Sequence, residues 1–275
     1  MKTVFVTTLV AFAAVSGSAL ASDFSQINGF SLEARLFNDF ANTNLTINGV
    51  NYPAPVTAAI PNPGMLTFDE QFAQGAAGNF ANKHVAWLSD NGGATRATTN
   101  ASQPLSLDFN VFMTAVSGSP RKEAGVQINQ PRPALGFTDE GQILIASDNG
   151  EVAVFGAALP FTGFGAGTYT LGTTAHVSFQ YVPAGVVDPT LGAYRLIFTD
   201  AVTGVHDSGF KVWGVESDGI AGLTNAVLGF KDQNQRNPFV ADGVTVIYSG
   251  ITITPAPTSA ALLGLAGLAM GRRRR

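Results

Sequence analysis

A regular alternation of apolar and polar side chains is the feature that most limits how this chain can fold. Between Leu105 and Ala115 every second residue is apolar, and the residues between them are polar except Phe112. Because the pattern repeats every two residues, the two sets lie on opposite faces of an extended strand. The segment therefore predicts an antiparallel strand with one face in a core and the other toward water.

Shorter runs of the same kind recur along the chain and are separated by turn residues. They span 124–129, 142–147, 151–155, 169–171, 176–182, 193–199, 209–213 and 244–254. No helical period in the body extends beyond two turns. The pattern predicts an all-β fold, an antiparallel β-sandwich or jelly roll. The least regular stretches, at 53–63, 75–82, 157–167 and 215–237, are expected to be loops, and the one at 157–167 to cover one end of a sheet.

One turn signal is stronger than the others. Asp148-Asn149-Gly150 separates two alternating runs, and an Asn-Gly pair favours the positive φ angles of a type I′ hairpin turn. We expect a hairpin there. Weaker versions of the same signal occur at Asn48-Gly49, Asn91-Gly92, Asp218-Gly219 and Asp242-Gly243.

The first 21 residues have the three regions of a secretory signal peptide. Lys2 supplies the positive charge, the stretch 4–15 is apolar, and Ala19 and Ala21 are the small residues that a signal peptidase needs, which predicts cleavage before Ser22. The stretch has no amphipathic period of the kind a packed N-terminal helix would show. The expected partners are the translocon and signal peptidase.

The C-terminus has three parts of its own. Pro255, Ala256 and Pro257 precede an apolar run at 259–271, and the chain ends in four arginines, namely Arg272, Arg273, Arg274 and Arg275. As a helix the apolar run would be about 20 Å long, short of the roughly 30 Å hydrocarbon core of a membrane. A short helix with arginines held on the cytoplasmic side suits transient membrane insertion before processing.

This tail resembles the PEP-CTERM sorting signal of Gram-negative and related bacteria, in which a Pro-Glu-Pro motif precedes an apolar transmembrane helix and a basic terminus. Ala256 stands where that family has glutamate. The resemblance implies processing by an exosortase-type membrane enzyme and a setting of exopolysaccharide and cell surface. A plain tail anchor is the alternative. The expected organisation is a signal peptide (1–21), a β-sandwich domain (22–254) and a sorting signal (255–275).

Composition narrows the possible partners. Five of the 15 basic residues lie in the two end segments, whereas all 19 acids lie in the body, so the body carries a net charge of −9. An acidic body lacks the basic surface that nucleic acid requires, so no nucleic-acid partner is expected. The chain has no cysteine, and its stability must therefore come from burial of apolar surface rather than from disulfides.

No residue pattern for catalysis is evident, so no catalytic residue and no enzyme activity are predicted. A glycoside hydrolase needs two carboxylates close together. Only Glu216-Ser217-Asp218 comes near the expected sequence pattern, and the second glutamate of that pattern is missing. His84, His176 and His206 lack the spacing of a zinc site. We expect His176 on a polar strand face and His206 in a turn.

Calcium is the one metal ion that the residues could bind, and no other cofactor is expected. Loop carboxylates and amides are its usual ligands. The candidates are Asp139, Glu140, Asp148, Asn149 and Glu151. A second set comprises Asp207, Asp218, Asp232 and Asn234. Solvated turn residues without an ion are the alternative for both sets.

The body also resembles concanavalin-like or laminin-G-like jelly rolls, through its number of strands and the stretches 122–128 and 149–152. That resemblance implies at most a carbohydrate-facing surface. Trp87 and Trp213, or Tyr181 and Tyr194, could stack on sugars, but both tryptophans lie in apolar runs and are expected in the core.

The sequence therefore predicts an exported, non-enzymatic protein of the cell envelope or extracellular matrix. A carbohydrate-binding module, with or without calcium, is the first alternative. An enzyme acting on polysaccharides is the second.

Overall fold

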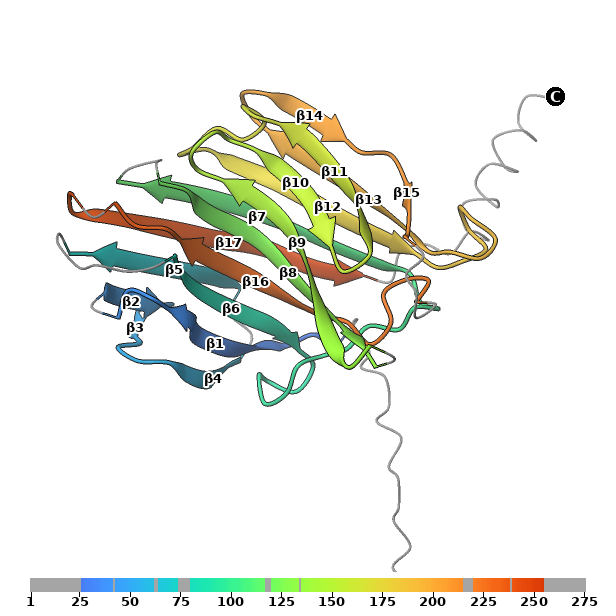
Figure 1. The fold of residues 1–275 in the computed structure, drawn as a ribbon, viewed down its shortest axis with the longest axis horizontal. Helices are drawn as coiled ribbons and strands as arrows, with labels where there is room; N and C mark the ends of the chain where they lie inside the picture. The colour runs from blue at the N-terminus through green and yellow to red at the C-terminus, as the bar shows by residue number, and fades with distance from the viewer. Residues whose placement is uncertain are drawn as a thin grey trace, which may run out of the picture.

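The computed structural model describes residues 26–41, 43–61, 64–73, 80–116, 120–133, 135–214, 220–237 and 239–254. Within these ranges the chain forms two antiparallel β-sheets that pack face to face, and no α-helix (Figure 1). None of the described segments is a helix suited to crossing a membrane. The predicted all-β antiparallel sandwich is confirmed. The predicted signal helix and C-terminal helix lie outside the described residues.

The first sheet has eight strands. In spatial order they are β11 (Leu159–Gly165), β10 (Val152–Gly156), β9 (Phe137–Ala146), β8 (Lys122–Arg132), β16 (Val227–Asn234), β6 (Asn82–Ser89), β1 (Gly29–Asn38) and β4 (Val56–Pro61).

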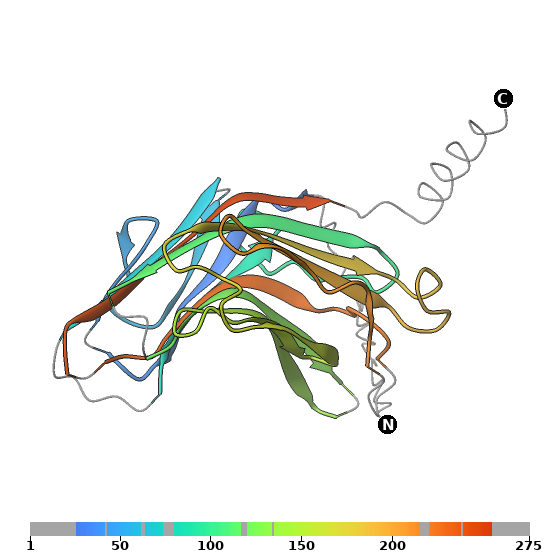
Figure 2. The ribbon, with the colours of Figure 1, turned by 90° about the horizontal axis from the view of Figure 1, so that it is seen from above.

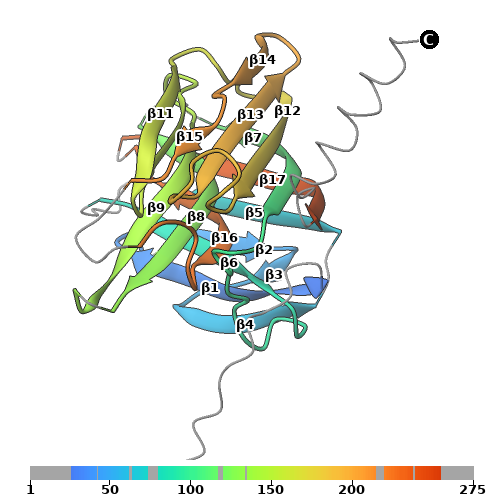
Figure 3. The same cartoon turned by 90° about the vertical axis from the view of Figure 1, so that its right-hand side faces the viewer.

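The second sheet has nine strands. Their order is β14 (Gly204–Asp207), β13 (Ala193–Asp200), β12 (Thr174–Val182), β7 (Leu105–Ala115), β17 (Asp242–Thr254), β5 (Met65–Phe72), β2 (Thr43–Ile47) and β3 (Val50–Asn51), with β15 (Lys211–Val212) paired to β13. In Figure 3, β4 and β3 lie toward one edge of the sandwich and β11 and β14 toward the other.

Strands that follow one another in sequence occupy matching places in the two sheets. The central order β8-β16-β6-β1 of one sheet corresponds to β7-β17-β5-β2 of the other. The chain thus passes repeatedly from sheet to sheet, as in a double-sheet jelly roll. The sandwich is also bent, and the eight-stranded sheet lies on the inner side of the bend (Figure 2).

The core forms where the alternating apolar faces of the two sheets meet. Phe109 of β7, Phe230 of β16 and Tyr248 of β17 pack together, with ring centroids 4.7 to 5.8 Å apart. The apolar residues of β7 that the alternation placed inside, from Leu105 to Met113, are all buried. The prediction of a half-buried strand at this position is therefore confirmed.

The strands β1 to β6, β11, β14 and β16 were not predicted, although β5 alternates regularly. β16 lies in a stretch expected to be a loop, because polar residues occupy both of its faces although nearly all are buried. β4 is an exposed edge strand. β11 lies in the stretch 157–167, which forms an edge strand rather than a loop over a sheet end. Residues 169–171 form a turn rather than a strand.

Two of the predicted turn signals lie in hairpins, and only the weaker one, Asn48-Gly49, gives a type I′ turn. Asn48 and Gly49 have φ angles of 49° and 77°, the paired positive values of a type I′ turn, and they join β2 to β3. At the β9–β10 hairpin only Gly150 has a positive φ, of 68°. Its loop is longer, since the N–H of Ala146 bonds to the carbonyl of Glu151. The type I′ turn predicted at Asn149-Gly150 is therefore wrong.

Gly125 of β8 offers a direct test of this sheet geometry. Its φ is 132°, and a Cβ there would lie 1.9 Å from the carbonyl oxygen of Ile143 on β9. We predict that Gly125→Ala lowers the free energy of unfolding in urea by at least about 2 kcal/mol, because it combines backbone strain with a collision with backbone. Gly64→Ala is the control, since its Cβ meets nothing within 4 Å. Equal effects of the two substitutions would contradict the assigned register.

Candidate functional site

Two groups of polar side chains distinguish this sandwich. One, the inter-sheet cluster, is buried between the sheets and comprises Arg35, Thr43, Glu70, Asn82, His84, Asp232 and Asn234. The other, the open-face network, lies on the face of the eight-stranded sheet turned away from the core and comprises Lys83, Glu123, Gln127, Asn129, Glu140, Gln142, Lys231 and Gln233.

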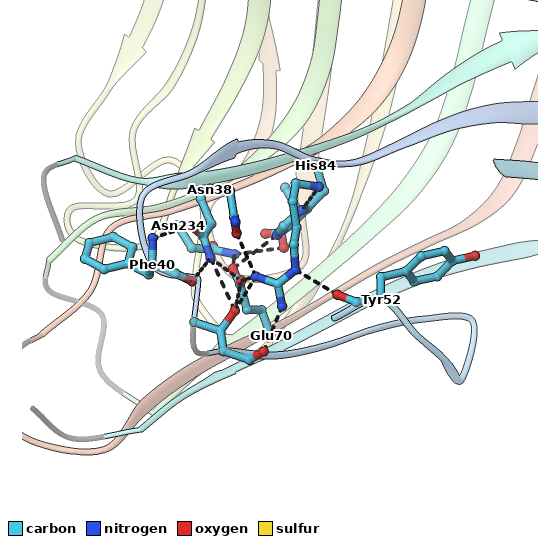
Figure 4. A network of polar contacts seen from close by, with 10 residues as sticks. Asn38, Phe40, Tyr52, Glu70, His84 and Asn234 are labelled. Carbon is cyan, nitrogen blue, oxygen red and sulfur yellow. Dashed lines mark hydrogen bonds and ion pairs between the residues drawn. The ribbon is translucent and has the colours of Figure 1, made fainter. Parts of the chain in front are cut away.

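Glu70 is the centre of the inter-sheet cluster (Figure 4). It projects from β5 of the nine-stranded sheet and is fully buried. Its Oε1 accepts hydrogen bonds from Thr43 Oγ1 at 2.8 Å and Asn82 Nδ2 at 2.6 Å, and its Oε2 accepts one from Asn234 Nδ2 at 3.0 Å. Arg35 Nη1 lies 3.9 Å from Oε1. Because Asn82, Asn234 and Arg35 belong to the eight-stranded sheet, one carboxylate links both sheets.

Arg35 reaches the cluster because β1 contains a bulge. The register with β6 shifts between Glu33 and Phe37, and Arg35 has a φ of 58°, in the left-handed region. The bulge directs Arg35 inward next to buried Ala34, against the alternation. Its guanidinium donates to the carbonyls of Tyr52 and Thr43, both at 2.7 Å. The hydrogen bonds offset a backbone conformation that costs about 1 to 3 kcal/mol.

In the described ranges, one group of side chains has ligand atoms close enough together to hold a metal ion. It consists of Glu70, His84 and Asp232, whose ligand atoms lie within 4.8 Å of one another. The hydrogen bond that His84 accepts does not suit that role. Its Nδ1 accepts a hydrogen bond from the Arg35 N–H at 2.8 Å, so the neutral imidazole carries its proton on Nε2. Nε2 is the atom 3.2 Å from Glu70 Oε2 that a metal would need. A metal-bound histidine donates through its second nitrogen, the reverse of what is seen.

The two acids of the cluster have opposite pKa shifts. Burial by itself would raise the pKa of Glu70, but neighbouring His84 and the hydrogen bonds from Asn234 and Asn82 lower it to about 2. Burial raises the pKa of Asp232 to about 7, and the charge of Glu70 adds to the rise. The cluster therefore holds a carboxyl of lowered pKa, 3.9 Å from the Arg35 guanidinium, beside a carboxyl of raised pKa.

The open-face network begins with Lys231 of β16. Its Nζ donates to Glu123 Oε2 of β8 at 2.9 Å and to Gln142 Oε1 of β9. Gln233 Nε2 donates to the same Glu123 oxygen at 3.2 Å. The Lys231 side chain is fully buried although it lies on the outward side of the sheet. Burial lowers the pKa of Lys231, and the carboxylate of Glu123 opposes the shift.

A second ion pair spans the same face. Lys83 of β6 and Glu140 of β9 belong to strands separated by β16 and β8, about 14 Å across a flat sheet. Their Nζ and Oε2 atoms nevertheless lie 3.4 Å apart. Side chains on this face therefore converge, as expected on the inner side of the bend in Figure 2.

Gln127 is a neighbour of this ion pair, and its side-chain oxygen accepts no hydrogen bond from a described residue. Its Nε2 donates to Asn129 Oδ1 at 2.9 Å and lies 3.3 Å from Glu140 Oε2. Its Oε1 is buried and has no hydrogen-bond partner among the described residues. A buried acceptor without a hydrogen bond lowers the free energy of unfolding by about 1 to 3 kcal/mol. The network thus contains a buried acceptor to which no described residue donates.

Aromatic rings accompany the network. Phe37 of β1 is 42 % exposed, and Lys83 Nζ lies 5.2 Å from its ring centroid. Phe161 of the edge strand β11 is 71 % exposed. Trp87 of β6 is instead covered by Arg96, and its indole N–H donates to Glu33. The open face therefore combines amides, paired charges and two accessible rings.

The structure distributes the five calcium candidates over separate ion pairs. Asp148 and Glu151 share Arg121, with N–O distances of 3.1 and 3.3 Å, and Asn149 Oδ1 accepts the Glu151 N–H. Asp139 lies 3.8 Å from Arg132, and Glu140 belongs to the open-face network. Calcium binding by these residues stays a prediction.

In the second set, Asp232 and Asn234 do lie together. Asn234 Nδ2 donates to Asp232 Oδ2 at 2.8 Å in the inter-sheet cluster. Asp207 lies apart from them, on β14, and pairs with Arg195. Asp218 lies outside the described residues, as does the whole Glu216-Ser217-Asp218 motif.

The aromatic and histidine expectations can also be compared with the structure. Trp87 and Trp213 are buried, as predicted. His176 lies on the solvent-facing side of β12, 3.2 Å from Asn110 Oδ1, which confirms its predicted place. His206 lies in strand β14 rather than in a turn.

The expected processing signals lie outside the described residues. For the signal peptide these are Ala19, Ala21 and Ser22. For the sorting signal they are Pro255, Ala256, Pro257, Arg272, Arg273, Arg274 and Arg275. Both expectations stay predictions.

Sequence reasoning named Asp232, Asn234 and Glu140 as calcium candidates but did not predict either polar group, and it missed Glu70 and Lys231. One signal was available in β5, where Glu70 occupies the same strand face as Leu66, Phe68 and Phe72. A carboxylate on an otherwise apolar face predicts a buried charge with partners. The open-face network had no such signal, because it is assembled from strands far apart in sequence.

No family model and no curated protein matches this chain. Solved structures with a similar arrangement of strands include the alginate lyase from Corynebacterium sp., with a TM-score of 0.47 and 13% identity over 82% of this chain and 94% of that one. The family 7 alginate lyase A1-II′ in complex with substrate has a TM-score of 0.45 and 12% identity, covering 84% and 93%. The seed lectin of Lotus tetragonolobus has a TM-score of 0.42 and 12% identity, covering 83% and 99%. These likenesses concern the fold alone.

Asp232 gives a pH-dependent test of the inter-sheet cluster. Its pKa is about 7 in the folded protein against 3.8 ordinarily, so between these values the folded state binds more protons. Stability from this group therefore falls as pH rises from about 4 to about 7. We predict that Asp232→Asn is more stable than the parent above pH 7, by a few kcal/mol as an order of magnitude (about 1.4 per pKa unit), and loses that advantage near pH 4.

Urea unfolding at both pH values measures the effect. Asp69→Asn, on the solvent-facing side of β5, is the control and should show no such pH-dependent difference. If Asp232→Asn differed from the parent equally at pH 4 and pH 8, the assignment of the raised pKa would be wrong.

Proposed function

We propose that this protein is an exported β-sandwich that binds glycans through the open face of its eight-stranded sheet. The observation that carries the proposal is the open-face network. A face turned away from the core holds amides and ion pairs drawn from β6, β8, β9 and β16, and these side chains include a buried, unpartnered acceptor at Gln127.

The functional groups of sugars are complementary to the side chains of the open face. Each ring offers hydroxyls that donate and accept hydrogen bonds, and its apolar C–H surface packs on an aromatic ring. Gln127, Gln142 and Gln233 provide amide groups held in place by neighbouring side chains. Phe37 provides an exposed ring next to Lys83. Preorganised polar groups beside an accessible ring favour binding because little side-chain freedom is lost.

The proposal assigns no reaction to this face. Its charged groups are held in ion pairs, Lys231 with Glu123 and Lys83 with Glu140, which suits positioning of polar groups more than proton transfer. Incubation of the protein with the polysaccharide that it binds tests this part. New reducing ends or unsaturated sugar ends would show that the protein is an enzyme.

Export and sorting complete the proposal. The N-terminal segment resembles a signal peptide, and the C-terminal segment resembles a PEP-CTERM signal with Pro255-Ala256-Pro257 at the motif. A sorted protein of this kind would work at the cell envelope or in the extracellular matrix, where exopolysaccharide is the available glycan. An exosortase-type enzyme would process the tail.

Gln127→Ala tests the binding face. We predict that the parent binds at least one glycan on an array that includes the exopolysaccharide of the source cells, and that Gln127→Ala weakens this binding about tenfold, since an amide that contacts the ligand is lost. Calorimetric titration with the best-bound oligosaccharide gives the ratio.

Gln180→Ala is the matched control. Gln180 is a half-buried glutamine on the outward side of β12, in the other sheet, so its loss should change affinity less than about twofold. Thermal unfolding shows whether each variant is folded. Failure of the parent to bind any glycan would refute the proposal, and so would equal binding by folded Gln127→Ala.

Mass spectrometry of the protein from its native cells tests export and processing. The mature mass should begin at Ser22 and should lack the apolar run and the four terminal arginines. Retention of 1–21 would refute export. Retention of 259–275 would refute processing of the tail.

A further inference from the structure

We infer that the open face selects an uncharged, hydroxyl-rich glycan and discriminates against polyuronates and other anionic polysaccharides. This inference rests on the proposed function and specifies its ligand class. It is drawn from two features of the open face: the pairing of its charges and the unpartnered acceptor at Gln127.

Every basic side chain placed on this face has a carboxylate partner. Lys231 pairs with Glu123 at 2.9 Å and Lys83 with Glu140 at 3.4 Å. Arg96, which covers Trp87, pairs with Glu33. The face thus presents matched charges rather than the unpaired cationic groups that an anionic ligand requires.

The buried pairs also resist exchange of partners. The Lys231 side chain is fully buried and that of Glu123 is 11 % exposed. An anionic sugar that took Lys231 from Glu123 would leave a carboxylate without its partner in a site shielded from water. Separation of such a pair is strongly unfavourable, so Lys231 cannot readily serve an incoming carboxylate.

One polar atom of the network is a buried acceptor without a donor among the described residues. Gln127 Oε1 has no hydrogen-bond partner in the described part of the chain. Glu140 is half exposed, and its Oε2 already interacts with Lys83 and Gln127. Acceptors bind hydroxyl donors, whereas a carboxylate or sulfate group has only acceptors to offer and would be repelled. A hydroxyl of a neutral sugar provides the donor that such an acceptor lacks.

The charge of the whole body acts in the same direction. The body carries a net charge of −9 once the two end segments are set aside. A negative field slows the approach of a polyanion and does not affect a neutral chain. Long-range and local electrostatics therefore favour the same class of ligand.

Paired titrations of the full folded protein test the inference. The neutral probes are oligosaccharides of glucose, mannose and galactose, and the anionic probes are oligomannuronate, oligoguluronate and oligogalacturonate of equal length. We expect a neutral probe to bind at least about tenfold more tightly than any uronate, with an affinity that changes less than about twofold between low salt and about 0.3 M salt.

The outcomes separate this inference from the proposed function. Tighter binding of a uronate, weakening as salt is added, would overturn the inference and leave glycan binding intact. Binding of no probe, and of no glycan on the array, would overturn both.

Glu140→Gln gives an independent measurement. The substitution leaves Lys83 without its carboxylate, so the affinity for uronates should rise relative to that for the neutral probe by about three- to tenfold at low salt. Asp69→Asn removes one negative charge from the other sheet and should leave the ratio unchanged. An unchanged ratio in folded Glu140→Gln would show that charge pairing does not set selectivity.

Discussion

The carboxylate of Glu70 is the interaction on which the arrangement of the two sheets depends at this end of the sandwich. It belongs to the nine-stranded sheet and accepts hydrogen bonds from side chains of β6 and β16 in the other sheet. A buried charge is tolerated only when it is fully hydrogen-bonded. The partners of Glu70 therefore fix how β5 lies over β6 and β16, in a way that apolar contacts alone do not.

The inter-sheet cluster and the open face are built from the same strand segments. On β6, Lys83 points to the open face and His84 to the cluster. On β16, Lys231 points outward while Asp232 points inward. Because neighbouring side chains on a strand project to opposite sides, any shift of register that disrupted the cluster would also displace the open-face residues. The bulge in β1 joins the two further, since it turns Arg35 into the cluster and leaves Phe37 on the open face.

Sequence patterns located β7 and most of the strands that follow it, but they missed β1 to β6, even though β5 alternates as regularly as β7. β7 alternates cleanly, and its core face followed directly from the residues. β16 is polar on both faces yet buried, so its composition looks like that of a loop. The turn at Asn48-Gly49 formed as its residues indicate, whereas the stronger signal at Asn149-Gly150 gave a longer loop, in which Asp148 pairs with Arg121. The turn preference of the local sequence therefore determined the turn type only where no tertiary contact competed with it.

The sequence by itself determined the fold class, the acidity of the body and the predicted signals at both ends, because periodicity, charge and short motifs are local properties. Tertiary structure alone decided which polar residues meet. Glu70 and Asn234 are hydrogen-bonded across 164 positions, and Lys83 and Glu140 meet across two intervening strands. The order of strands in a sheet and the bend of the sandwich bring such residues together, and neither is written in the spacing of residues along the chain.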